Sequence, residues 1–191
     1  MRRARLGLAL VILLSLVIAC GQKGRKDPQT ISQSPVATAE NYPSLAVQAK
    51  EVNDAFSRKD FARFMDLTYL KVIEMAGGRE QMVAAMNKEL KEMESEGVVL
   101  LSSTSGAPTQ FIHDSGSIYA VLPITLKVKA QEGIFQSEGS MIGISSDGGA
   151  NWTFIDSSGK DLSELKKLIP GIADKLSLPP PKPPVKISNG D

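Results

Sequence analysis

The spacing of apolar residues changes once along this chain, close to Gly97. Before that residue, apolar side chains recur every three or four positions, which is the period of a helix that buries one face. After it, they alternate with polar residues, which is typical of half-buried strands. Because helices and strands are segregated along the sequence, we expect an α+β fold, with N-terminal helices on a curved, about four-stranded antiparallel sheet and a C-terminal helix.

Three helices are expected in the first half of the folded region. A proline and a serine open the first, an aspartate caps the second, and a glycine pair precedes the third. The segment 68–73 fits either a further helical turn or a short strand. The expected helices are 45–58, a short helix after Asp60, and 79–96.

Two hairpins are expected in the second half, because short alternating segments flank turn-forming residues. A last helix begins near Asp161 and is interrupted by Pro170. The strand-like segments are 98–104, 110–113, 118–129, 133–144 and 151–156.

The first twenty residues have the composition of an export signal. Three arginines precede a 14-residue apolar run over 6–19, which is shorter than the ~20 residues that cross a bilayer as a helix. The run ends in Val17-Ile18-Ala19-Cys20, and Cys20 is the only cysteine. These residues resemble the lipobox of bacterial lipoproteins.

The lipobox resemblance implies that the chain is cleaved between Ala19 and Cys20. It also implies a diacylglyceryl thioether on the Cys20 thiol and acyl chains such as palmitate, which together anchor a protein stably in a membrane. A plain secreted protein and an uncleaved membrane anchor are the alternatives. Gly21 follows the cysteine where an aspartate would favour inner-membrane retention. We therefore expect a lipid-anchored protein of the bacterial cell envelope and periplasm, at the outer membrane more than the inner.

Four regions are expected along the chain. Residues 1–19 are the lipoprotein signal peptide, and 20–41 are the lipidated cysteine with a flexible tether rich in polar residues, glycine and proline. Residues 42–178 form the folded domain. Residues 179–191 form a Pro-rich disordered tail.

Three stretches of the domain resemble the nuclear transport factor 2-like family, whose cone-shaped fold is shared by ketosteroid isomerase. They are 55–61, 78–82 and the end of the last strand at 152–154. The resemblance implies a cone interior between the helices and the sheet, which some members use for isomerase, cyclase or dehydratase chemistry.

The sequence offers little for catalysis inside such a cone. Ketosteroid isomerase uses a tyrosine from its first helix and aspartates from its strands. Here the segment 45–58 has no tyrosine, and 118–129 has no carboxylate or histidine. His113, the only histidine, falls on an expected hairpin turn over 113–116, and one histidine with one cysteine cannot form a Cys/His zinc cluster within one chain. We therefore expect no enzyme activity, metal or cofactor, and the alternative is an envelope isomerase or cyclase with an atypical active site.

The leading hypothesis is a membrane-anchored lipoprotein with a non-catalytic, binding cone domain. Its ligand would be an envelope protein or a small apolar molecule. Long, adaptable methionines and aromatic rings could line the pocket. The candidate lining residues are Phe56, Phe64, Met82, Met86 and Trp152.

The net charge of the chain and the open face of the sheet concern three further possible partners: nucleic acid, anionic lipid and a second copy of the chain. Removing residues 1–19 removes three arginines and no acidic residue, so the formal charge falls from +1 to −2. This charge gives no reason to expect nucleic acid, and no basic run remains to hold anionic lipid. A homodimer through the open sheet face, with Tyr119, Thr125 and Lys127 at the interface, is a further alternative.

Residues 145–152 fit the pattern S-x-D-x-G-x-x-W. They look like an Asp-box, the hairpin motif of sialidase-type propellers, but one copy in a chain of this length cannot build a propeller. We expect a structural turn in which Asp147 accepts backbone N–H groups and Trp152 packs beneath. The motif residues are Ser145, Asp147, Gly149 and Trp152.

Overall fold

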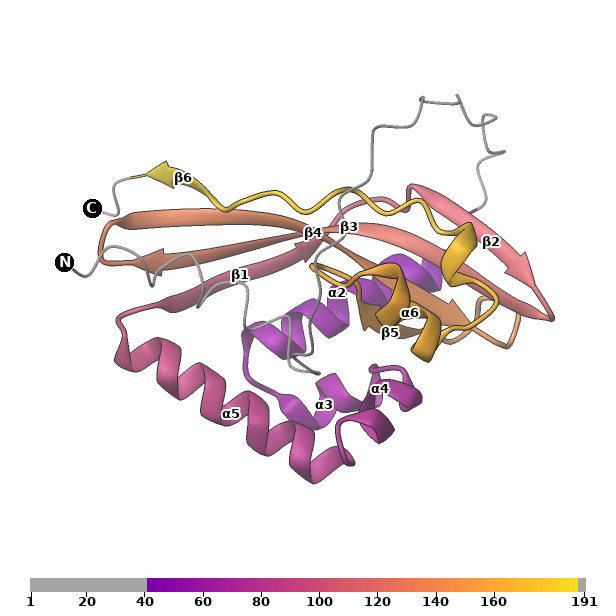
Figure 1. Cartoon of the computed structure of the whole chain (residues 1–191), viewed down its shortest axis with the longest axis horizontal. Helices are drawn as coiled ribbons and strands as arrows, with labels where there is room; N and C mark the ends of the chain where they lie inside the picture. The colour runs from indigo at the N-terminus through magenta and orange to yellow at the C-terminus, as the bar shows by residue number, and fades with distance from the viewer. Residues whose placement is uncertain (1–40, 189–191) are drawn as a thin grey trace.

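A computed structural model describes residues 41–188 (Figure 1). The expected signal peptide, Cys20 and most of the tether lie outside these residues. The helices of the first half are α2 (Pro43–Ser57), α3 (Phe61–Asp66), α4 (Leu70–Met75) and α5 (Arg79–Ser95). The strands are β1 (Val99–Ser105), β2 (Gln110–Asp114), β3 (Ser117–Ala130), β4 (Gly133–Ser145), β5 (Thr153–Asp156) and β6 (Val185–Ser188). Between the last two strands lie α6 (Leu162–Leu168) and a 3-10 turn, η1 (Ala173–Lys175).

The α+β fold predicted from the sequence is confirmed. In Figure 1, β3 and β4 cross the view as a long curved pair, and α3, α4 and α5 lie below them. The predicted caps account for several helix boundaries. The Asp60 carboxylate accepts a hydrogen bond from the Arg63 N–H at 3.1 Å, and Asp161 and Glu164 form a reciprocal capping box at the start of α6.

The sheet has six strands but only four positions across its width. β3 and β4 form the central hairpin, in unbroken register from Ile118 opposite Ser145 to Ala130 opposite Gly133. β1 and β2 share the outer edge of β3, while β5 and β6 share the outer edge of β4. The expectation of about four strands therefore describes the width of the sheet, and the two extra strands arise because each edge is divided in two.

The segment 68–73, for which a helical turn and a short strand were both expected, contains one of each: a strand-like bridge at Thr68 and a helix from Leu70. Thr68 forms a parallel bridge with Phe154, and the Tyr69 N–H donates to the Phe154 carbonyl at 3.0 Å. Leu70 then begins α4, a fourth helix that the sequence analysis did not separate. This short contact closes the free edge of β5, so the segment behaves as a strand where it meets the sheet and as a helix beyond it.

The expectation of a disordered tail over 179–191 is wrong at 185–188, where the chain forms a strand. After the proline run, residues 185–188 form β6 and pair with β4 at 134–136. Prolines lack the N–H that a sheet ladder needs, so pairing begins only at Val185, directly after Pro184. The β4 edge otherwise leaves backbone groups unpaired, which gives this segment a reason to add to it.

The sheet buries side chains on both of its faces. Its concave face packs against α2, α3 and α5, and its convex face is covered at one end by α6 and η1. The concave clusters include Leu45, Leu122, Trp152 and Phe154 near α2, and Phe61, Leu90, Met93 and Val128 near α5. The convex cluster includes Ile142, Ile144, Ile155, Leu165 and Ile169.

The cover on the convex face corrects one expectation about a homodimer. Tyr119 does not lie on an open sheet face, because it packs in the cluster beneath α6 and η1. Thr125 and Lys127 lie farther along β3, outside that cluster. The uncovered part of the convex face is therefore the half of the sheet built from β1, the end of β3, the start of β4, and β6.

Candidate functional site

None of the five expected pocket residues lines either of the two hollows that the structure shows along α5. Trp152 is only 2% exposed and belongs to the cluster under α2. Phe56 and Met86 pack in the cluster under α5, and the rings of Phe56 and Phe64 lie 5.6 Å apart between centroids. Met82 is half-buried near the start of α5. Apart from Met82, these side chains belong to the packed clusters between the helices and the sheet.

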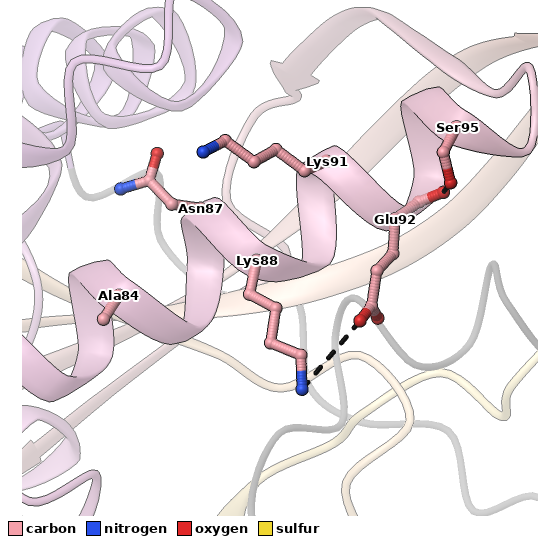
Figure 2. Close-up of a pocket in the computed structure, with 6 residues that line it drawn as sticks. All are labelled: Ala84, Asn87, Lys88, Lys91, Glu92 and Ser95. Carbon is pink, nitrogen blue, oxygen red and sulfur yellow. Dashed lines mark hydrogen bonds and ion pairs between the residues drawn. The ribbon is translucent and has the colours of Figure 1, made fainter.

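Two hollows lie instead along α5, on the outside of the domain. The described residues that line the first, of about 410 Å³, all come from this one helix (Figure 2). Across it, the Lys88 ammonium lies 3.9 Å from the Glu92 carboxylate, and the Ser95 hydroxyl donates to the Glu92 carbonyl at 2.7 Å. The lining residues are Ala84, Asn87, Lys88, Lys91, Glu92 and Ser95.

The second hollow, of about 530 Å³, continues from the first toward α3. Arg79 stands at its end, where the guanidinium contacts the Asp66 carboxylate at 2.7 Å. Both hollows open to solvent, so neither encloses a small molecule in the manner of a ligand pocket. The lining residues of the second are Ala62, Arg79, Glu80, Val83, Ala84 and Asn87.

A carboxylate that the sequence analysis did not single out ends β5. Asp156 lies opposite Met141 on the concave face, and its Oδ1 accepts the Ser158 N–H at 2.9 Å. Burial raises the pKa of Asp156, while Lys160 and the hydrogen bonds from Ser158 oppose the rise. The only signal in the sequence is a run of turn-forming residues, Asp156-Ser-Ser-Gly159, which resembles any other turn.

The surroundings of Asp156 form a closed structural joint between β4 and β5. The Ser157 hydroxyl donates to the Ser140 carbonyl at 2.8 Å and lies 2.9 Å from the Ser140 hydroxyl. The Ser140 N–H in turn donates to the Ser158 hydroxyl at 3.1 Å. Among residues 41–188, every buried side-chain polar atom has a hydrogen-bond partner, and no three His, Cys, Asp or Glu side chains gather as a metal site would require. The serine hydroxyls of this joint bond one another and the Ser140 carbonyl of β4, and so hold β4 to the end of β5.

The best-defined polar constellation is the turn between β4 and β5. Asp147 Oδ1 accepts the backbone N–H groups of Ala150 and Asn151 at 3.1 and 2.9 Å. It also accepts the Ser145 hydroxyl at 2.8 Å, and Oδ2 accepts the Asn151 amide at 2.7 Å. These hydrogen bonds, chiefly those from Asn151, lower the pKa of Asp147 to about 2.

The same turn is fastened to the start of α2. The Trp152 indole N–H donates to the Gly149 carbonyl at 3.0 Å and to the Ser44 hydroxyl at 3.2 Å. Gln48 of α2 bonds the backbone of Ala150 and Trp152 at 3.0 and 2.8 Å. Both carboxylate oxygens of Asp147 accept hydrogen bonds from residues of its own loop. Because the loop is bonded in turn to Ser44 and Gln48, the motif attaches the β4–β5 hairpin to the start of α2.

His113 lies on β2, opposite Ile118, with an exposed side chain. This position is a strand rather than the turn, which is formed by Ser115 and Gly116.

Comparison with known proteins adds no relative to this description. Within residues 41–188, no helix combines the length and the apolar character that crossing a bilayer requires. No protein-family model matches the chain, and neither a curated protein nor a solved structure matches it significantly.

Proposed function

We propose that this chain is a lipid-anchored protein of the bacterial cell envelope whose folded domain is a non-catalytic binding module that works through its surface. The lipobox-like Val17-Ile18-Ala19-Cys20 supports the anchor. The main support for binding through the surface is the packed interior of the domain. There Leu45, Leu122 and Trp152 fill the space between α2 and the sheet.

Opening that interior for a small molecule would be costly. Displacing Trp152 would expose a large apolar side chain and break its indole hydrogen bonds to Gly149 and Ser44. The ring also meets Tyr42 edge-on, with 5.6 Å between centroids. A partner that contacts the outside of the domain requires none of these changes.

The enzymatic alternative would rest on Asp156, which lies on the concave face with a raised pKa. Its Oδ1 accepts the Ser158 N–H, and Lys160 from the same turn acts on its pKa. Asp156 and Lys160 both belong to this turn, so we propose that they stabilise it and do not form the acid–base pair that isomerase chemistry uses.

Mass spectrometry of the full chain, extracted from membranes with detergent, tests both parts of the proposal. Under denaturing conditions we expect a mature chain that begins at Cys20 and carries diacylglyceryl and acyl mass. A chain that begins at Gly21 or Gln22 without lipid would contradict the anchor. A Cys20→Ser chain should lack the added mass and fail to mature at the same rate.

Under native conditions, the same sample should carry no stoichiometric small molecule in its interior. An apolar molecule that survives extraction and remains bound at one copy per chain would contradict surface binding. The native and the denaturing measurements are independent tests. The native spectrum reports a non-covalently bound ligand, and the denaturing spectrum reports covalently attached lipid.

A further inference from the structure

The uncovered half of the convex face has an unusual composition. Pairing places Val99, Lys129 and Ile134 side by side across the sheet, on the face opposite the α5 cluster. The next row on this face places Lys127 beside Gln136 and Val185. Leu101 occupies a bulge in β1 between these rows. We call this surface the convex arm face, made of Val99, Leu101, Lys127, Lys129, Ile134 and Val185.

Aliphatic side chains border the convex arm face on both edges. Val99 and Leu101 on β1 are each 46% exposed, and Val185 on β6 is 62% exposed. Together with Ile187, also on β6, they make up half of the large hydrophobic side chains that are exposed among residues 41–188. A gathering of this kind on one surface marks a contact region more than isolated exposed side chains do.

The centre of the convex arm face is basic. No ion pair joins Lys127 or Lys129 to an acidic side chain in the described part of the chain, whereas Glu138 at the border is paired with Lys182 at 2.9 Å. Residues 41–188 as a whole carry 16 basic and 18 acidic side chains, a formal charge of −2. The face is therefore opposite in sign to the domain that carries it.

We infer that the convex arm face rests on the surface of a bilayer that contains anionic lipid. The inference depends on the proposed lipid anchor. Aliphatic side chains enter the boundary between headgroups and acyl chains, while lysines extend their long stems toward anionic headgroups. The exposed strands at the two edges and the lysines between them match this chemistry.

The anchor would make even a weak contact effective. Residues 20–40 can span at most about 75 Å when extended, so a lipid on Cys20 confines the domain to a layer of that depth above the bilayer. Confinement replaces a bimolecular encounter with an intramolecular one. The convex arm face then needs only to orient the domain, leaving α5 and its hollows directed away from the membrane.

A second copy of the chain fits this surface less well. A two-fold contact through the same face would bring Lys127 and Lys129 of both copies together. Glu138 is the nearest acid on β4, and Lys182 already engages it. Like charges would face one another, whereas an anionic bilayer supplies the missing opposite charge.

Fluorescence of the full-length lipidated protein in vesicles tests the inference. An environment-sensitive fluorophore is attached at Leu101→Cys, or at Val47→Cys on α2 as the control, since Val47 is also apolar and is 65% exposed. In vesicles of phosphatidylethanolamine with phosphatidylglycerol, we expect a blue shift and quenching by lipid-borne quenchers at position 101 and neither change at 47. Added salt or omission of phosphatidylglycerol should reduce the effect.

Charge reversal supplies a second readout. The pair Lys127→Glu and Lys129→Glu should abolish the shift at position 101, whereas the matched pair Lys88→Glu and Lys91→Glu on α5 should preserve it. Co-flotation with vesicles but equal signals at positions 101 and 47 would overturn the membrane contact and leave the anchor intact. Failure to co-float would overturn the anchor and the contact together. A shift that follows protein density and ignores phosphatidylglycerol would assign the face to a second copy and overturn the inference.

Discussion

Asp147 shows how a single exposed carboxylate can organise a loop. Its oxygens accept two backbone N–H groups, a hydroxyl and a side-chain amide. The charged form is the one that these donors favour, which is why the pKa of Asp147 falls to about 2. A lowered pKa means that the folded state holds the proton less tightly than the unfolded chain.

The first prediction concerns the pH dependence of this carboxylate. Replacing Asp147 by Asn retains an oxygen but removes the charge, and replacing it by Ala removes the hydrogen bonds too. Above about pH 4, the ordinary aspartate value, we expect both variants to melt below the wild type, by about 2–4 °C for Asp147→Ala and less for Asp147→Asn.

The stabilisation from the Asp147 charge is present above the unfolded pKa and is lost as the pH falls through the folded value of about 2. The difference in melting temperature between the wild type and Asp147→Asn should therefore shrink between about pH 4 and pH 2. Glu74→Gln, on an exposed position of α4, serves as the control. A difference that stays constant over this range would contradict the charge-based account.

A second prediction distinguishes the two adjacent glycines of the turn. Both have positive φ, +75° at Gly148 and +93° at Gly149, so alanine at either position pays a backbone cost of about 1–2 kcal/mol. A Cβ at Gly149 would also lie 2.3 Å from Tyr42 Cδ1, while a Cβ at Gly148 would meet open space. Denaturant unfolding should show that Gly149→Ala loses about 1–3 kcal/mol more than Gly148→Ala. Equal losses would mean that Tyr42 moves aside without cost.

At the scale of elements, β6 is the least expected feature and the weakest strand. All four of its side chains are exposed, so its place depends on backbone pairing with β4 and on the ion pair between Lys182 and Glu138. An exposed ion pair of this kind adds little. Strands held in this way open before the core does.

The third prediction follows from this weak attachment. Deleting residues 185–191 should raise amide exchange at 134–136 while lowering global stability by only about 1–2 kcal/mol, because few hydrogen bonds and no core side chain are lost. Deleting 189–191 alone is the control and should leave exchange unchanged. A cooperative loss of the whole fold in the longer deletion would show that β6 is part of the core.

At the scale of the whole molecule, the sheet separates two environments. The end near β5 is covered on both faces, by α2 on one side and by α6 and η1 on the other. The other end is covered by α5 on its concave face alone. This asymmetry leaves the convex arm face as the exposed sheet surface and is the reason for placing the proposed membrane contact there.

The candidate pocket shows the limit of reading side chains from a pattern. The periodicity places Phe56, Phe64 and Met86 toward the sheet, where they lie. Whether such residues surround a cavity or fill it depends on distances between elements, which no local spacing contains. Here Phe56 and Phe64 meet each other, and Trp152 lies under α2.

Some features of this protein follow from its sequence alone, because they depend on neighbouring residues. Helical and alternating periods give the order of helices and strands, Asp60 and Asp161 cap helices a few residues away, and Asp147 organises its own loop. Other features exist only in the folded chain, because they join residues that are distant in sequence. In the folded chain, η1 covers Tyr119 and β6 pairs with β4. Folding also places Lys127 and Lys129 between aliphatic side chains of β1 and β6, and because these residues are distant in sequence, no local pattern predicts the surface that they form.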